Sequence, residues 1–160
     1  MRDIVRLPKK ILSDTGWKIG PIQPRYAPVF PKSRPLPPGW EWRAFSLEAP
    51  DEQLTLLLQT ASGRNKYMAW LMRSGKAGTG VLLVRIEDQP GKRGLHVHAD
   101  CRNPLRSGPA GLGAGGMRYP GHGNRHRRTQ NWTRDTFWRQ VRDMLRVEHF
   151  DKDGQGPLEL

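Results

Sequence analysis

Five short runs of alternating or continuously apolar residues fill the chain between Trp40 and Cys101. Glycine, proline, asparagine and acidic residues separate the runs, and such spacing is typical of an antiparallel meander. The runs cover residues 40–45, 54–59, 66–73, 81–87 and 94–101. The sequence therefore predicts an antiparallel sheet of about five strands, a common size for a sheet.

One helix is predicted after the sheet, over residues 133–147. Thr133 can cap its first turn, where Asp135 also favours the helix dipole. Its apolar residues follow the spacing i, i+1, i+4, i+7, i+8 and form one stripe: Phe137, Trp138, Val141, Met144 and Leu145. We expect an α+β fold in which this C-terminal amphipathic helix packs on one face of the sheet.

The segments that flank this unit differ from it in composition. Residues 1–39 are basic and hold most of the 14 prolines, which lack the N–H that a central strand donates. We expect them to form an extended arm ahead of a single domain at 40–150. Residues 102–132 interleave glycine with arginine, and a loop of this length is usually functional or disordered. Residues 151–160 are predicted to be a tail.

Charge and cysteine content indicate the compartment and the class of partner. The 160 residues carry a formal net charge of +12, with a sequence pI of about 10.7. A polyanion such as RNA is the expected partner of a chain with this charge. Cys101 is the single cysteine, and the first ten residues contain no apolar signal-peptide core. We expect a cytoplasmic protein that does not enter the membrane.

The run at 94–101 carries the most chemistry. If it is a strand, alternation places His96, His98 and Asp100 on one face, with Val97 on the other. On the preceding strand, Arg85 and Glu87 should likewise face away from the core. Two imidazoles about 6.5–7 Å apart suit either an acid/base pair at a phosphodiester or two ligands of one metal ion.

Several short motifs follow one another in this unit. They are a tyrosine-led strand, a strand that ends in acids, a Gly/Lys turn, a His-x-His segment and a helix with Phe-Trp followed by Val. The residues are 66–71 (KYMAWL), 85–88 (RIED), 90–94 (PGKRG), 96–98 (HVH) and 136–142 (TFWRQVR). This combination resembles the TumE-like toxin family of bacterial type II toxin–antitoxin systems, over residues 66–101 and 133–146, under half of the chain. The resemblance implies a growth-inhibiting toxin that acts on RNA and is neutralised by a cognate antitoxin, often one with a helix-turn-helix domain.

The chain also departs from the family pattern. Neither the basic N-terminal arm nor the Gly/Arg insert before the helix belongs to that pattern. Asp135 and Thr136 stand where the family tends to place Asp directly before Phe-Trp. These departures leave the substrate and the partner contacts undetermined.

The residue types suit RNA cleavage without a metal cofactor. One imidazole of the pair His96 and His98 would take the 2′-OH proton and the other would protonate the leaving 5′-oxygen, with the two roles unassigned. Arg85 is the candidate for stabilising the phosphorane charge. Tyr67 is a possible base-stacking residue, although a half-buried strand position suits it better. The remaining substrate-binding candidates are Lys92, Arg93, Tyr119, Arg125, Arg127 and Arg128.

Two alternatives remain open at this point. An HUH-type single-strand DNA nuclease would use His96, His98 and Glu87 as ligands of a divalent metal ion, with Tyr119 as its nucleophile. A non-catalytic nucleic-acid-binding protein would use the basic arm and loop to hold phosphates. Strongly salt-dependent binding without cleavage is the signature of the latter.

Overall fold

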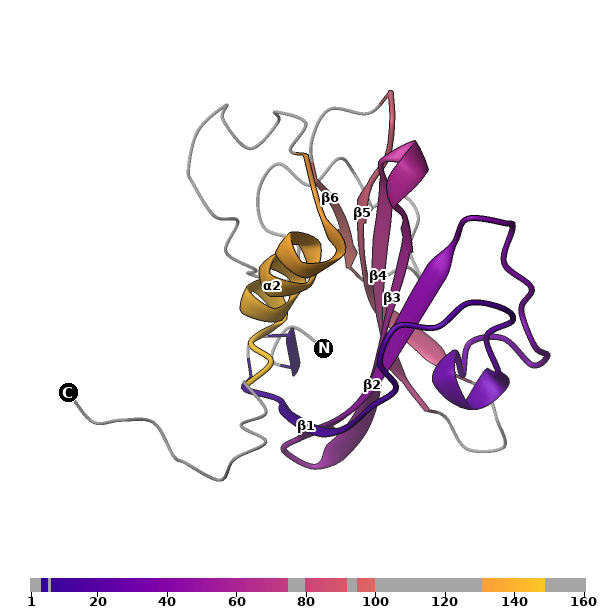
Figure 1. Ribbon diagram of the computed structural model, residues 1–160. Helices are drawn as coiled ribbons and strands as arrows, with labels where there is room; N and C mark the ends of the chain where they lie inside the picture. The colour runs from indigo at the N-terminus through magenta and orange to yellow at the C-terminus, as the bar shows by residue number, and fades with distance from the viewer. Residues whose placement is uncertain (1–3, 6, 75–79, 92–94, 100–130, 149–160) are drawn as a thin grey trace.

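Six strands form one antiparallel sheet in chain order, and one helix packs on it (Figure 1). The computed structural model describes residues 4–5, 7–74, 80–91, 95–99 and 131–148. The strands are β1 (Lys10–Asp14), β2 (Glu41–Ala49), β3 (Glu52–Ala61), β4 (Lys66–Arg73), β5 (Val81–Asp88) and β6 (His96–Ala99). The helix is α2 (Arg134–Leu145), and two short 3-10 turns are η1 (Pro24–Tyr26) and η2 (Ser62–Arg64). The predicted α+β class is confirmed, with one strand more than the five expected.

Local sequence explains the tight turns of the meander. Asp51 joins β2 to β3 with φ +68°, and Asn65 follows η2 with φ +48°. Asp and Asn adopt this left-handed region more readily than other residues with a side chain, because their short polar groups bond to the local backbone. These two turns bring β2, β3 and β4 into continuous register.

Helix α2 covers one face of the sheet, as predicted. The side chains of Phe137, Val141 and Leu145 are fully buried among apolar residues of the strands. Thr133 caps the helix: its hydroxyl accepts a hydrogen bond from the Thr136 backbone N–H, and the Thr136 hydroxyl accepts one from the Thr133 backbone N–H. This reciprocal cap fixes where the helix begins.

The later part of the N-terminal arm, from Ile22 to Leu36, lies against the other face of the sheet, which corrects the expectation of an arm outside the domain (Figure 1). The first part of the arm forms β1, which adds a sixth strand to the five that were predicted. Its later part buries Ile22 and Ala27 against Trp42, Leu57 and other sheet residues. Prolines interrupt this segment, but the apolar residues between them bury enough surface to hold it in place. An antiparallel bridge between Ile22 and Arg34 provides hydrogen bonds for the backbone N–H and carbonyl groups of both residues.

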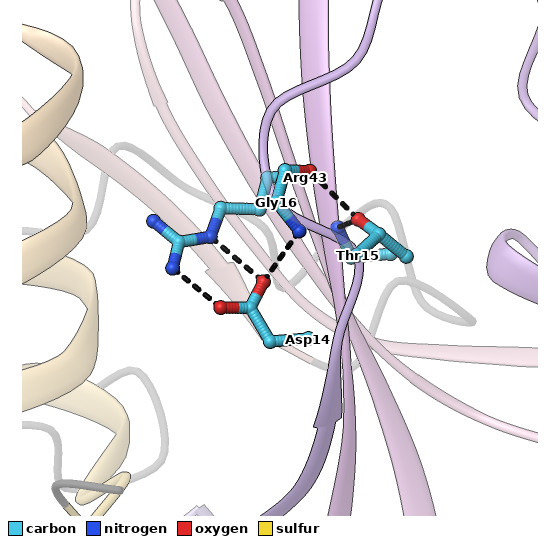
Figure 2. A network of polar contacts seen from close by, with 5 residues as sticks. Asp14, Thr15, Gly16 and Arg43 are labelled. Atoms are coloured by element: carbon cyan, nitrogen blue, oxygen red, sulfur yellow. Dashed lines mark hydrogen bonds and ion pairs between the residues drawn. The ribbon is translucent and has the colours of Figure 1, made fainter. Parts of the chain in front are cut away.

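A polar network fixes the point where the chain leaves β1 for the second face (Figure 2). Asp14 accepts hydrogen bonds from the Gly16 backbone N–H at 2.8 Å and from Nε of Arg43 at 2.9 Å. The Thr15 hydroxyl accepts one from the Ala44 N–H at 2.9 Å. Gly16 has φ +65°, a conformation that costs glycine little. The network ties the arm to β2 on both sides of this bend.

The arm also contacts the start of β5, where space is tightest. The backbone N–H of Gly80 donates to the Pro28 carbonyl at 2.9 Å. A Cβ at Gly80 would lie 2.3 Å from the Pro28 carbonyl carbon. We therefore expect Gly80→Ala to push the arm off β5 and to lower the free energy of unfolding by about 1–3 kcal/mol in urea denaturation.

Gly63→Ala is the matched control, because a Cβ at Gly63 meets nothing within 4 Å. Its effect on the free energy of unfolding should stay within about 0.5 kcal/mol. Equal effects of the two substitutions would show that the arm does not pack on β5 as described.

The first described residues are tied to the end of α2. The Nζ atom of Lys9, a fully buried side chain, donates to the carbonyls of Leu145 at 2.7 Å and Leu7 at 2.8 Å. Burial, together with the nearby Arg146, lowers the pKa of Lys9 to about 8. The Lys9 backbone also pairs with the residues that follow the helix, Arg146 and Glu148. This contact links the segment before β1 to the end of α2.

Candidate functional site

The pairing of β5 with β6 brings four polar side chains to one corner of the sheet. Arg85 lies opposite His98, and Glu87 lies opposite His96. All four are on the face turned away from α2, whereas Val84, Ile86 and Val97 are buried on the helix side. The predicted facing of Arg85, Glu87, His96 and His98 is therefore confirmed.

Two cross-strand rows continue from this corner across the same face. One row runs from His98 through Arg85 to Trp70 on β4. The other runs from His96 through Glu87 and Met68 to Gln59 on β3. Side chains directly opposite each other on neighbouring strands have Cβ atoms about 4.5–5.5 Å apart, so the members of a row can touch.

Glu87 lies at the centre of the charged corner. Its side chain is only 4% exposed. One carboxylate oxygen lies 3.4 Å from Nε of Arg85 and accepts a hydrogen bond from the Gln89 amide at 3.0 Å. The other oxygen lies 3.4 Å from Nε2 of His98. Cationic and polar partners of this kind offset part of the free-energy cost of burying a carboxylate.

The environment of His98 favours its neutral form. Burial lowers its pKa below the usual 6.5, and the positive charge of Arg85 lowers it further, while Glu87 acts in the opposite direction. Because the shift is downward, His98 is a neutral imidazole at pH 7. A neutral imidazole can accept a proton, which is the requirement for a general base.

Several buried nitrogen and oxygen atoms of this face have no hydrogen-bond partner within the residues that the structure describes. They are Nε2 of His96, Nε1 of Trp70 and both amide atoms of Gln59, while Nε of Arg85 and Nε2 of His98 have only the 3.4 Å ion-pair contacts with Glu87. Buried polar atoms without partners cost free energy, and most native proteins contain few of them. Their concentration along these two rows distinguishes this region as the place where a polar ligand would gain most.

The opposite face holds a second, separate polar contact. Nε1 of Trp132 donates to Asp88 at 2.6 Å, and the Tyr67 hydroxyl donates to the Trp132 carbonyl at 2.6 Å. Burial raises the pKa of Asp88, although the Trp132 bond and the charge of His96 oppose the rise. Tyr67 is 2% exposed and lies on the helix side, so the possibility that it stacks on bases is wrong. These contacts anchor the segment that enters α2.

Some predicted site residues lie outside the described residues: Asp100, Lys92, Arg93, Tyr119, Arg125, Arg127 and Arg128. The structure brings together Arg85, Glu87, His96 and His98. It adds Gln89, Trp70 and Gln59, which the sequence analysis did not single out. Strand alternation could have placed Gln59 and Trp70 on the histidine face only together with the registers of β3, β4 and β5, which the structure supplies.

Neither a metal-binding group of side chains nor a helix able to span a membrane is found where the structure describes the chain. Within ranges 4–5, 7–74, 80–91, 95–99 and 131–148, no three His, Cys, Asp or Glu side chains are placed to hold a metal ion. Glu87, His96 and His98, the suggested ligand set, therefore do not form such a group. None of the helices in these ranges is long and apolar enough to cross a membrane.

Comparison with known proteins finds no similar sequence or structure. No family model, no curated protein and no solved structure matches the chain.

Proposed function

We propose that the protein is a toxin of a bacterial toxin–antitoxin system and that it cleaves RNA by metal-independent acid/base catalysis. The observation that carries the proposal is the arrangement of Arg85, Glu87, His96 and His98 on one face of β5 and β6. It combines two imidazoles, a fixed cation and a buried carboxylate on a chain of net charge +12.

The lowered pKa of His98 supports an assignment of the two histidine roles. His98 removes the proton of a ribose 2′-OH, and the resulting 2′-oxygen attacks the neighbouring phosphorus. Because Nε2 of His98 faces Glu87 at 3.4 Å and carries its hydrogen there, the 2′-OH proton goes to Nδ1, and Glu87 stabilises the imidazolium that forms. His96 gives a proton to the departing 5′-oxygen, and Arg85 offsets the charge of the phosphorane. The products are a 2′,3′-cyclic phosphate and a free 5′-hydroxyl.

Access to the two histidines is part of this mechanism. Nε2 of His96 is buried, and the His98 side chain is only 18% exposed. RNA must therefore displace neighbouring side chains at the β6 edge before the imidazoles can reach it. Such local opening is common where binding excludes water from a reacting group.

The toxin assignment comes from the resemblance of residues 66–101 and 133–146 to the TumE-like family. A toxin of that kind requires a cognate antitoxin, and a helix-turn-helix protein is the partner we propose. The positive charge attracts RNA in the cytoplasm, where we place the protein.

The test compares the wild type with His96→Ala/His98→Ala in bacteria under induced expression. We expect growth arrest and RNA fragments with 2′,3′-cyclic phosphate ends from the wild type alone. Asp143→Ala is the control, because Asp143 is exposed on α2, across the sheet from the histidines. It should arrest growth like the wild type.

Each other outcome favours a different function. Equal arrest by wild type and double variant, without RNA fragments, would indicate a non-catalytic nucleic-acid-binding protein. Cleavage of single-stranded DNA that requires Mn²⁺ or Mg²⁺ and forms an adduct on Tyr119 would indicate the HUH-type nuclease. No arrest from a folded wild type would rule out the toxin.

A further inference from the structure

Arg34 of the N-terminal arm is held rigidly over the sheet face that carries the histidines. Its backbone N–H donates to the Ile22 carbonyl at 2.9 Å, and its carbonyl accepts from the Ile22 N–H at 2.9 Å. Its guanidinium carbon lies 4.9 Å from the ring centre of Trp70 and 4.8 Å from that of Phe30. Contact with two rings fixes the plane and position of this cation.

Arg34 has the surroundings of an arginine that binds an anion, but no anionic group contacts it among the described residues. Burial lowers its pKa, and its Nη1 atom is buried without a hydrogen-bond partner. Other arginines differ: Arg43 pairs with Asp14 and Arg73 with Glu52. Desolvating a guanidinium without a carboxylate costs free energy, which a bound anion would return.

The ring beneath Arg34 belongs to the same row as the candidate catalytic groups. Trp70 is 8% exposed, lies opposite Arg85, and has an unpartnered buried Nε1. Arg85 in turn lies opposite His98. Two strand spacings, about 10 Å, separate the backbones of Trp70 and His98. The Arg34 guanidinium, which lies over Trp70, is therefore placed two strands away from His98, a position that suits a phosphate next to the one at the histidines.

We propose that Arg34 binds a phosphate of single-stranded RNA next to the phosphate that is cleaved. The choice of the cleaved phosphate depends on the proposed function, whereas the anion site at Arg34 does not. The planar guanidinium donates two parallel N–H bonds to phosphate oxygens, which a lysine ammonium cannot do. The N-terminal arm is thereby part of the nucleic-acid site.

The first test measures binding of a fluorescent single-stranded DNA hexamer, which lacks the 2′-OH that cleavage needs. Arg34→Gln should weaken binding about 10-fold, as expected for loss of a charge-assisted hydrogen bond. It should also make the slope of log K against log salt shallower by about 0.7, the value for one phosphate contact to a single strand. Arg34→Lys should restore the slope but not the full affinity.

Arg25→Gln is the matched control. It removes the same charge from the same arm, and Arg25 also lies over a ring, that of Tyr26, but it is exposed. Its effect on the salt slope and affinity should be much smaller. Equal effects of Arg25→Gln and Arg34→Gln would overturn the proposal, because any positive charge would then serve. Thermal melts of both variants check that the arm stays folded.

The second test uses cleavage of two RNA substrates. A dinucleotide contains only the cleaved phosphate, so Arg34→Gln should change its KM far less than the KM of a longer substrate. For a tetranucleotide the same substitution should raise KM about 10-fold. Equal KM values of wild type and variant on the tetranucleotide would overturn the proposal while leaving the nuclease intact. Arg34-dependent DNA binding without any RNA cleavage would refute the nuclease and support the phosphate site.

Discussion

Replacing His98 by alanine is expected to slow RNA cleavage by about 10²- to 10⁴-fold, the usual contribution of a general base. The residual kcat/KM of the variant should also lack the decline at low pH that the wild type shows. Because the pKa of His98 is lowered from 6.5, the wild-type rate should stay high as pH falls through 6.5 and decline only below it. The measurement is kcat/KM on a short RNA between pH 4.5 and 8.

Two neighbouring substitutions should move this acid limb in opposite directions. Arg85 lowers the pKa of His98 and Glu87 raises it. Arg85→Gln should therefore shift the limb to higher pH, and Glu87→Gln should shift it to lower pH. Both variants will also be slower. If Arg85 and Glu87 had only a structural role, however, the two substitutions would not move the acid limb in opposite directions. Shifts of the same sign would contradict the assignment of His98 as the base.

Replacing Phe137 by alanine is expected to lower the free energy of unfolding by about 3–5 kcal/mol, the range for a large side chain lost from a core. Phe137 is fully buried, and its ring centre lies 5.4 Å from that of Tyr67 and 5.9 Å from that of Trp132. The substitution opens a cavity between α2 and β4 and loosens Trp132, which bonds to Asp88. Urea denaturation followed by circular dichroism gives the change.

Arg139→Ala is the control on the same helix, since Arg139 is exposed. Its effect should stay within about 0.5 kcal/mol. A loss below about 1 kcal/mol for Phe137→Ala would mean that α2 does not pack on the sheet in solution.

Local sequence signals account for most of the fold. The alternation of the five runs predicted β2 to β6, because the alternation of apolar and polar residues depends only on the sequence within each strand. The apolar stripe and Thr133 predicted α2, including its N-cap. Strand β1 escaped prediction because Ile11 is its one buried residue, so its five residues carry no alternating pattern. Its stability comes from pairing with β2, a long-range effect.

The candidate site was only partly predictable for the same reason. Alternation placed His96 and His98 on one face, and Arg85 and Glu87 on one face. It could not show that Arg85 lies opposite His98, because the register of β5 and β6 is fixed by tertiary packing. The docking of Arg34 on Trp70 joins residues far apart in the chain, which no local pattern reports.

The contact between Lys9 and the end of α2 has a consequence for folding during synthesis. Neighbouring strands of the meander are also neighbours in the chain, so each can pair soon after it leaves the ribosome. The bond from Lys9 to the Leu145 carbonyl spans 136 residues. It forms only after Leu145 has emerged from the ribosome, so the nascent sheet exposes its apolar helix face until then. During that interval a chaperone or a co-translated partner can bind the face that α2 later covers.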